Sequence, residues 1–203
     1  VNQDANKMER LQRMIRPFIL RRLKGDVLKD LPEKIEENVF ARLDGEQMQL
    51  YDAYATRMKE MLSQQNEKEF HKGRMQILSE LTKLRQLCCD PALLFEDYKG
   101  ESAKVQMCMD PVFCISLKAG GTGLNLTSAD IVIHYDPWWN VAVQNQATDR
   151  AHRIGQKHVV TVYKLVAEGT IEEKIIDIQE KKKKLAEQVL EGEGMDSVVF
   201  TKE

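Results

Sequence analysis

A glycine-rich segment, SLKAGGTGLNL from Ser116 to Leu126, has the composition of a turn that contacts phosphate. Gly120, Gly121 and Gly123 let the backbone turn sharply and come close to a ligand. Exposed N–H groups and the hydroxyl of Thr122 can bind phosphate oxygens. The segment is not a Walker A loop, because no Lys-Ser/Thr pair follows its last glycine. A structural turn between a strand and a helix is the alternative explanation.

A second segment, QATDRAHRIGQ from Gln146 to Gln156, carries two arginines at a spacing that suits phosphate chemistry. On a helix, Gln146, Arg150 and Arg153 fall at i, i+4 and i+7 and share one face, with Asp149 beside them. Planar, permanently charged guanidinium groups stabilise the negative charge that develops during phosphoryl transfer. A surface helix with ordinary salt bridges is the alternative.

Short apolar runs around these segments predict a parallel sheet. They cover residues 112–116, 131–135 and 159–165. Continuous apolar runs of this length are typical of strands buried on both faces. A helix over about 141–152 follows the second run. This alternation of strands and helices predicts an α/β fold.

The first hundred residues are predicted to be mainly helical. An amphipathic helix containing Met8 should end or kink at Pro17. A short strand over 35–43 precedes a helix, and Asp44 with Gln47 resembles the capping box of that helix.

Two more helices have clear boundary signals. A helix containing Ile77 and Leu84 should stop at Asp90-Pro91. A long C-terminal helix should begin at Gly169-Thr170, with Glu173 completing a capping box.

The composition is that of a globular chain: 42% of the residues are hydrophobic and 31% are charged. No apolar run approaches the ~20 residues of a membrane span, so no membrane partner is expected. The N-terminus lacks the hydrophobic core of a secretory signal, which favours an intracellular protein. The four cysteines contain no CxxC pair, so we expect reduced thiols rather than a zinc site.

The overall charge does not indicate nucleic-acid binding, because 30 Lys+Arg nearly balance 32 Asp+Glu. Any such contact must come from local patches. Residues 10–24 hold six basic and no acidic residues, and Lys181 to Lys184 are four consecutive lysines. A solvated helix face for the first patch and a solvated turn for the second are the alternatives.

Taken together, these segments and DPWWN between them (Asp136 to Asn140) closely resemble the second RecA-like lobe of the Swi/Snf class of superfamily-two helicase-like ATPases. Ser116 to Leu126 resembles motif V, and Gln146 to Gln156 resembles motif VI with its DRxHRxGQ core. The resemblance continues in PFILRRLKGDVLKDLPEK (17–34), LRQLCCDP (84–91) and VYKLVAEGTIEEKI (162–175). Val141 departs from the pattern, since the family often has proline there.

The resemblance implies a domain organisation within an α/β, RecA-like (P-loop NTPase-type) fold. Residues 1–43 would be the end of the first lobe and the inter-lobe link, and 44–100 a helical inter-lobe region. Residues 101–168 would be the second lobe, and 169–203 a brace helix and tail. The second lobe is too short for its family, with the junction near 104–111. If that piece is deleted, bare sheet edges and apolar faces should make solubility marginal.

The resemblance also implies roles at an ATP site between two lobes. Arg150 and Arg153 would be arginine fingers aimed at the γ-phosphate, and Asp149 and His152 would hold them in place. The residues assigned to the nucleotide are Gln146, Gly121, Gly123 and Asp149.

A DNA-facing set follows from the same resemblance. Trp139 could offer an aromatic platform to a base, or could be buried in support of motif VI. The residues assigned to DNA are Lys118, Thr122, Gly123, Asn125 and Trp139.

No GxxxxGK[ST] loop and no Asp-Glu-x-His segment occurs in the 203 residues. The chain alone is therefore not expected to turn over ATP. The resemblance implies the C-terminal half of an ATP-dependent double-stranded-DNA translocase, with ATP and Mg as cofactors and the metal held mainly by the first lobe. Double-stranded DNA, that first lobe and a DNA-bound protein complex are the expected partners. The location would be cytoplasmic and nucleoid-associated in a bacterium, or nuclear in a eukaryote. A non-enzymatic DNA- or protein-binding fragment is the alternative.

Overall fold

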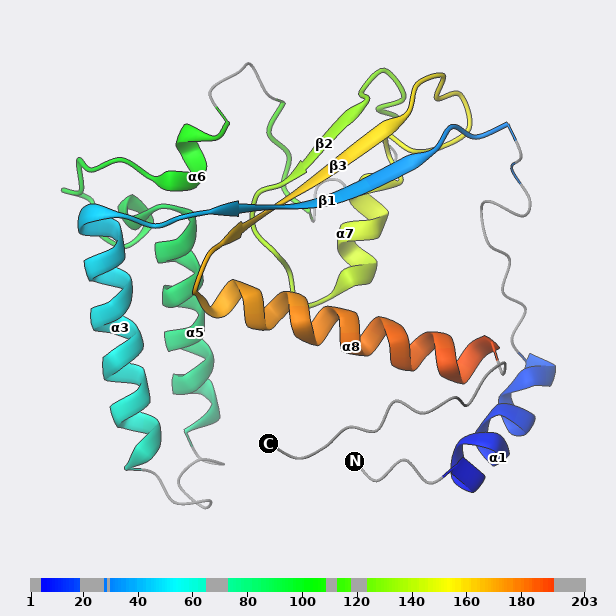
Figure 1. Ribbon diagram of the computed structural model, residues 1–203, viewed down its shortest axis with the longest axis horizontal. Coiled ribbons are helices and arrows are strands. Elements are labelled where there is room, and N and C mark those ends of the chain that lie inside the picture. The colour runs from blue at the N-terminus through cyan, green and yellow to red at the C-terminus, as the bar shows by residue number, and fades with distance from the viewer. Residues whose placement is uncertain are drawn as a thin grey trace. The chain divides into compact units, whose positions relative to one another are not determined.

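The computed structural model describes residues 5–18, 28, 30–64, 73–108, 113–117 and 124–191. The chain divides into two compact units, one formed by Asp30–Asp177 and the other by Val1–Lys29 with Ile178–Glu203. The first unit contains the sheet and most of the helices (Figure 1). The second contains α1 (Ala5–Ile15), which ends immediately before a 3-10 turn at Arg16–Phe18, as Pro17 predicts.

The sheet is parallel and has three strands: β1 (Lys34–Ala41), β2 (Ile131–His134) and β3 (Val160–Ala167). Their order is β1-β3-β2, so β3 is the central strand (Figure 1). All eight residues of β1 pair with β3. The predicted α/β class and the runs at 131–135 and 159–165 are confirmed.

The prediction of a strand at 112–116 is wrong for residues 113–116, which are not in a strand; residue 112 lies outside the described residues. Phe113 is 76% exposed and Ile115 is also exposed. An apolar run becomes an inner strand only where neighbouring elements cover it. Nothing in the described part of the chain covers this one.

The two faces of the sheet differ in burial. On one face, Val160 and Val162 are fully buried against Ala151, with Ala129 and Val132 beside them. The opposite face is bare where the strands begin. There Ile35, Thr161 and Ile131 lie side by side in register; Ile35 is 39% exposed and Ile131 is 56% exposed. Two exposed isoleucines, Ile35 and Ile131, therefore lie at this end of the described sheet.

Helices α3 (Gly45–Ser63) and α5 (Arg74–Cys89) lie side by side and form a second apolar core. Its buried members include Tyr51, Met58 and Leu87. Helix α5 ends where predicted, because Asp90 is extended and its carboxylate accepts a hydrogen bond from Ala92 N at 2.8 Å.

The predicted capping box of α3 is wrong. Asp44 occupies the N-cap position but makes no side-chain capping bond. The side chain of Gln47 is buried, and its amide donates to Leu87 O at 2.8 Å and accepts from Ala103 N at 3.1 Å. Gln47 thus joins α3 to α5 and α6 (Ala103–Gln106) instead of capping its own helix.

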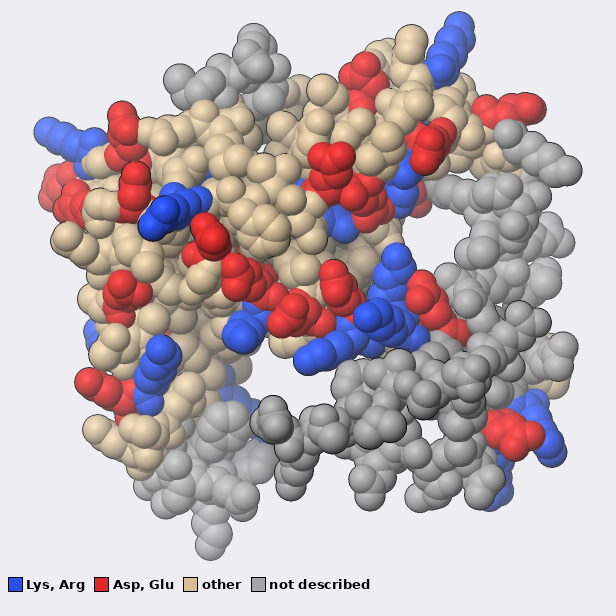
Figure 2. All heavy atoms as spheres, in the orientation of Figure 1, with Lys and Arg blue, Asp and Glu red and all other residues tan. Residues whose placement is uncertain are grey.

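Helix α8 (Ile171–Glu191) begins with the predicted box. Thr170 Oγ1 accepts from Glu172 N at 3.2 Å, and Glu173 Oε1 accepts from Gly169 N at 2.9 Å. Lys181 to Lys184 lie inside α8 and are exposed, so the predicted turn there is wrong; lysine is a good helix former. Acidic and basic side chains both line α8 in Figure 2. No helix among the described residues is long and apolar enough to cross a membrane.

Ile131→Lys should reduce self-association and change the free energy of unfolding by less than about 0.5 kcal/mol, because this side chain is already more than half exposed. The matched change Val162→Lys puts an ammonium group into the buried face and should cost more than about 4 kcal/mol. Light scattering and urea unfolding measure the two effects. Equal losses of stability in both variants would contradict a bare face at Ile131.

Candidate functional site

Helix α7 (Val141–Thr148) is shorter than predicted, and the two candidate arginines follow it in a turn. His152 N still donates to Thr148 O at 3.0 Å, but Arg153 N donates to Ala151 O at 3.2 Å. The prediction that Gln146, Arg150 and Arg153 share one helix face is therefore wrong. Gln146 is exposed on α7, whereas Arg150 and Arg153 are half-buried in the turn.

Tertiary contacts of two buried side chains explain why the helix stops. A ring nitrogen of His152, Nε2, lies 2.7 Å from Pro32 O, far away in the sequence. Gln156 Nε2 donates to Ala129 O at 2.8 Å, while its Oε1 accepts from the N–H groups of Lys157 and His158. These bonds need a compact turn, which Gly155 completes with φ +101°.

The turn is joined to the end of the glycine-rich segment. Leu126 N donates to Arg150 O at 2.9 Å. The guanidinium of Arg153 reaches Leu124 O at 3.5 Å, the outer limit of a hydrogen bond. The turn that carries the two arginines therefore contacts Leu124 and Leu126, the last part of the segment that resembles motif V.

The structure leaves part of the predicted site undescribed. Lys118, Gly121, Thr122 and Gly123 lie outside the described residues. Asn125 is exposed, and Asp149 is half-buried next to Arg150.

The DPWWN segment leads into α7. Asn140 caps the helix, since its Oδ1 accepts from Ala142 N at 3.0 Å. Trp139, the predicted DNA platform, is half-buried, whereas its neighbour Trp138 is exposed. The guanidinium of Arg85 lies over the Trp138 ring, 4.7 Å from the centroid, and also donates to Asp136 Oδ2.

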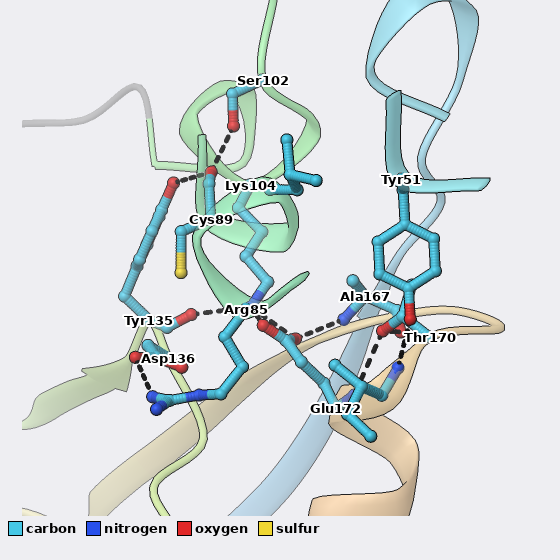
Figure 3. A network of polar contacts seen from close by, with 12 residues as sticks. Tyr51, Arg85, Cys89, Ser102, Lys104, Tyr135, Asp136, Ala167, Thr170 and Glu172 are labelled. Carbon is cyan, nitrogen blue, oxygen red and sulfur yellow. Dashed lines mark hydrogen bonds and ion pairs between the residues drawn. The ribbon is translucent and has the colours of Figure 1, made fainter. Parts of the chain in front are cut away.

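The ion pair between Lys104 and Glu172 is fully buried (Figure 3). Lys104 Nζ donates to both carboxylate oxygens of Glu172, at 2.8 and 2.6 Å, and to Tyr135 O at 2.9 Å. Glu172 also accepts from Ala167 N at 2.8 Å. These bonds connect α6, the end of β3, the first turn of α8 and Tyr135, which lies between β2 and the DPWWN segment.

Neighbouring groups extend this connection, which we call the buried hub: Lys104, Glu172, Tyr135, Cys89 and Ser102 (Figure 3). Cys89 O accepts from Tyr135 Oη at 2.8 Å and from Ser102 Oγ at 2.6 Å. Sequence reasoning missed the hub. Glu172 falls inside the segment 162–175 that resembles the family, but its separation of 68 residues from Lys104 gives no local sign that the two pair.

Three possible metal ligands meet at the hub: Cys89, Asp136 and Glu172 offer atoms within 4.8 Å of one another. Both carboxylates already form ion pairs: Asp136 with Arg85, and Glu172 with Lys104. Burial raises the pKa of Cys89 to about 12, so its thiol keeps its proton at neutral pH. The arrangement therefore consists of two ion pairs and a protonated thiol.

Comparison with known proteins finds two matching families. Residues 1–93 match the family described as "SNF2-related domain", and residues 103–155 match "Helicase conserved C-terminal domain". A Bacillus subtilis protein, provisionally named as an ATP-dependent helicase/translocase, is 34% identical over 270 positions, which cover all of this chain and 29% of that protein.

Two solved structures from Sulfolobus solfataricus have the same fold. The SWI2/SNF2 ATPase core in complex with dsDNA is 30% identical, with a TM-score of 0.59, and the match covers 91% of this chain and 52% of that one. The SWI2/SNF2 ATPase C-terminal domain is 26% identical, with a TM-score of 0.53, over 78% of this chain and 90% of that one. The α/β fold is thus that of a helicase C-terminal lobe, and the chain belongs to the SNF2-related family of helicase-like ATPases.

The chain spans less than a third of the length of the curated relatives it matches. The Bacillus alignment has 270 positions for 203 residues, so 67 of them have no counterpart in this chain. The predicted shortfall in the second lobe stays a prediction, because the comparison does not place the unmatched positions. Its position near 104–111 and the four domain boundaries stay predictions.

Lys104→Met should destabilise the protein by about 3–5 kcal/mol, because it leaves the Glu172 carboxylate buried without its cation. The double variant Lys104→Met/Glu172→Gln removes both charges and keeps an oxygen that can accept from Ala167 N. It should be more stable than Lys104→Met. Urea unfolding of the single and double variants tests this, and additive losses would contradict a coupled pair.

His134 predicts a pH dependence of stability. It is buried at the end of β2, with Nε2 2.8 Å from Thr148 Oγ1 at the end of α7. Burial, with a smaller contribution from the charge of Lys164, lowers its pKa from 6.5 to about 4. The unfolded chain therefore binds a proton between these values and the folded chain does not.

Stability should consequently decrease as the pH falls from 6.5 to about 4, by up to about 3 kcal/mol from this residue. His134→Gln replaces the ring by an amide that does not titrate, and should flatten the curve over that range. Urea unfolding at a series of pH values measures it. An unchanged slope in His134→Gln would assign the pH dependence to other groups.

Proposed function

We propose that this chain is the C-terminal helicase-like part of an ATP-dependent double-stranded-DNA translocase, and that it contributes Arg150 and Arg153 to an ATP site shared with a first lobe. The observation that carries the proposal is the contact between the arginine turn and the end of the glycine-rich segment. Two half-buried arginines in contact with Leu124 and Leu126, at the end of the glycine-rich segment, suit the phosphates of ATP. Gln146, Gly121, Gly123 and Asp149 complete the proposed nucleotide contacts.

The fit is good for phosphate and poor for magnesium. The carboxylates of Asp136 and Glu172 in the possible metal-ligand group already face Arg85 and Lys104. Mg²⁺ prefers carboxylates and phosphate oxygens that are free to coordinate it. ATP is the proposed cofactor of this chain, with Mg²⁺ held mainly by the first lobe.

When ATP is bound, its γ-phosphate supplies the group that is transferred to water. Arg150 and Arg153 would offset the negative charge that develops there, and the bond between Arg150 O and Leu126 N would hold their turn against the DNA-facing segment. Closure of the two lobes would then move that segment along the DNA. The residues proposed to contact DNA are Lys118, Thr122, Gly123, Asn125 and Trp139.

Support for the DNA partner comes from the archaeal relative solved in complex with dsDNA. Contacts of this kind follow the phosphate backbone irrespective of sequence. A DNA-bound protein complex is the proposed object of the translocation.

The missing P-loop pattern and the 67 unmatched positions favour a second candidate, a non-enzymatic DNA- or protein-binding fragment. The two candidates differ in what happens once a complete motor is assembled around this chain.

The test completes this chain with the first lobe of the Bacillus relative and with the positions of that relative that have no counterpart here, and measures ATP turnover with and without duplex DNA. Arg153→Ala should lower DNA-stimulated turnover by about 10³-fold or more, because a charge-stabilising arginine is lost from the transition state. The matched control, Arg57→Ala, removes an exposed arginine of α3 and should change turnover by less than about twofold. DNA-stimulated turnover that does not depend on Arg153 would contradict the proposal. Salt-dependent duplex binding without turnover would favour the non-enzymatic binding fragment.

A further inference from the structure

Arg85 is a buried charge that the proposed function does not use. It lies on α5, is 7% exposed, and makes both of its described contacts with the segment that leads into α7. Its terminal nitrogen donates to Asp136 Oδ2 (Figure 3), and its planar group stacks on Trp138. The partners lie 51 residues away in the sequence.

This contact satisfies neither partner fully. Arg85 Nε and Asp136 Oδ1 are both buried without a hydrogen-bond partner. In this pair the Arg85 side chain is buried and the Asp136 side chain is 36% exposed. Such a pair with unfilled hydrogen-bonding positions contributes little net stability, because the cost of removing the arginine from water is not fully offset. The stability that this pair contributes therefore explains poorly why an arginine stands at position 85. The position in which it holds the start of α7 explains it better.

The geometry concerns the start of α7. Four residues after Asp136, Asn140 caps this helix. Helix α7 has eight residues and is about 12 Å long. A short straight helix moves as one body, so a shift at its first residue also displaces the turn that carries Arg150 and Arg153.

We propose that Arg85 is a positioning residue for this turn: its ion pair with Asp136 and its stacking on Trp138 fix where α7 begins, and thereby where Arg150 and Arg153 lie. The proposal rests on the proposed function for the role of the two arginines. Lysine cannot replace Arg85, because an ammonium group cannot stack as a plane and hold a carboxylate in a fixed orientation at the same time.

The first test uses the 203-residue chain and amide hydrogen exchange. In Arg85→Met and Arg85→Lys, the amides of Asp149, Arg150 and His152 should exchange at least about 10-fold faster, because α7 and its turn open more easily. Amides of α3 should change by less than about threefold. The matched control Lys83→Met removes a lysine from the same helix, where it pairs with Glu80, and should leave α7 unchanged.

Asp136→Asn covers the case in which loss of the arginine prevents folding. It keeps the size of the side chain and an oxygen that can accept from Arg85, and it should raise the same exchange rates by about threefold. Equal acceleration over the whole chain, or none at α7, in these variants overturns the proposal.

The second test measures kcat and the KM for ATP in the completed two-lobe protein. Arg85→Lys should lower kcat by about 10-fold or more and change KM by less than about twofold, because misplacement affects the transition state more than binding. If Arg153→Ala abolishes turnover while Arg85→Lys leaves kcat intact, the positioning proposal is overturned. If turnover does not depend on Arg153 while Arg85→Lys still speeds amide exchange at α7, the proposed function is contradicted and the structural effect of Arg85 remains supported.

Discussion

The ion pair between Lys104 and Glu172 is the interaction on which the rest of the larger unit depends. Both side chains are completely buried, so neither charge is tolerable without the other. The pair ties the first turn of α8 to α6, and the bond from Lys104 to Tyr135 O ties both to the strand end before DPWWN. The turn between β3 and α8 and the segment that leads towards the proposed arginine turn are therefore both held by this one ion pair.

Two other kinds of contact, apolar and polar, act differently from each other in this unit. The apolar core between α3 and α5 supplies area removed from water, which stabilises the fold without fixing directions. The polar contacts at the ends of α7 fix directions: Asn140 at its start, and the pair His134 and Thr148 at its end. An active-site arginine must be held to within a fraction of an ångström, which apolar packing alone does not provide.

Helix boundaries set by neighbouring residues were predictable from the sequence. Contacts between side chains and residues distant in the sequence were not. Pro17 and the Thr170 box act on their immediate neighbours, so the sequence located these helix boundaries correctly. The segments resembling motifs V and VI, taken together with DPWWN, were also sufficient to identify the family. Gln47 was predicted to cap a helix and instead bridges two others, and the helix through His152 stops because that side chain bonds Pro32. Such choices depend on residues distant in the sequence, which no local pattern reports.

The pairing of β1 with β3 has a consequence for how the protein is made. Lys34 of β1 faces Val160 of β3, so the first strand leaves the ribosome more than 120 residues before its partner exists. At bacterial and eukaryotic synthesis rates this interval is roughly 6 to 25 seconds, far longer than hydrophobic collapse takes. During that time Ile35, Val39 and Phe40 have no central strand to join. The nascent polypeptide therefore carries the apolar residues of β1 without their partner strand until translation has passed residue 167.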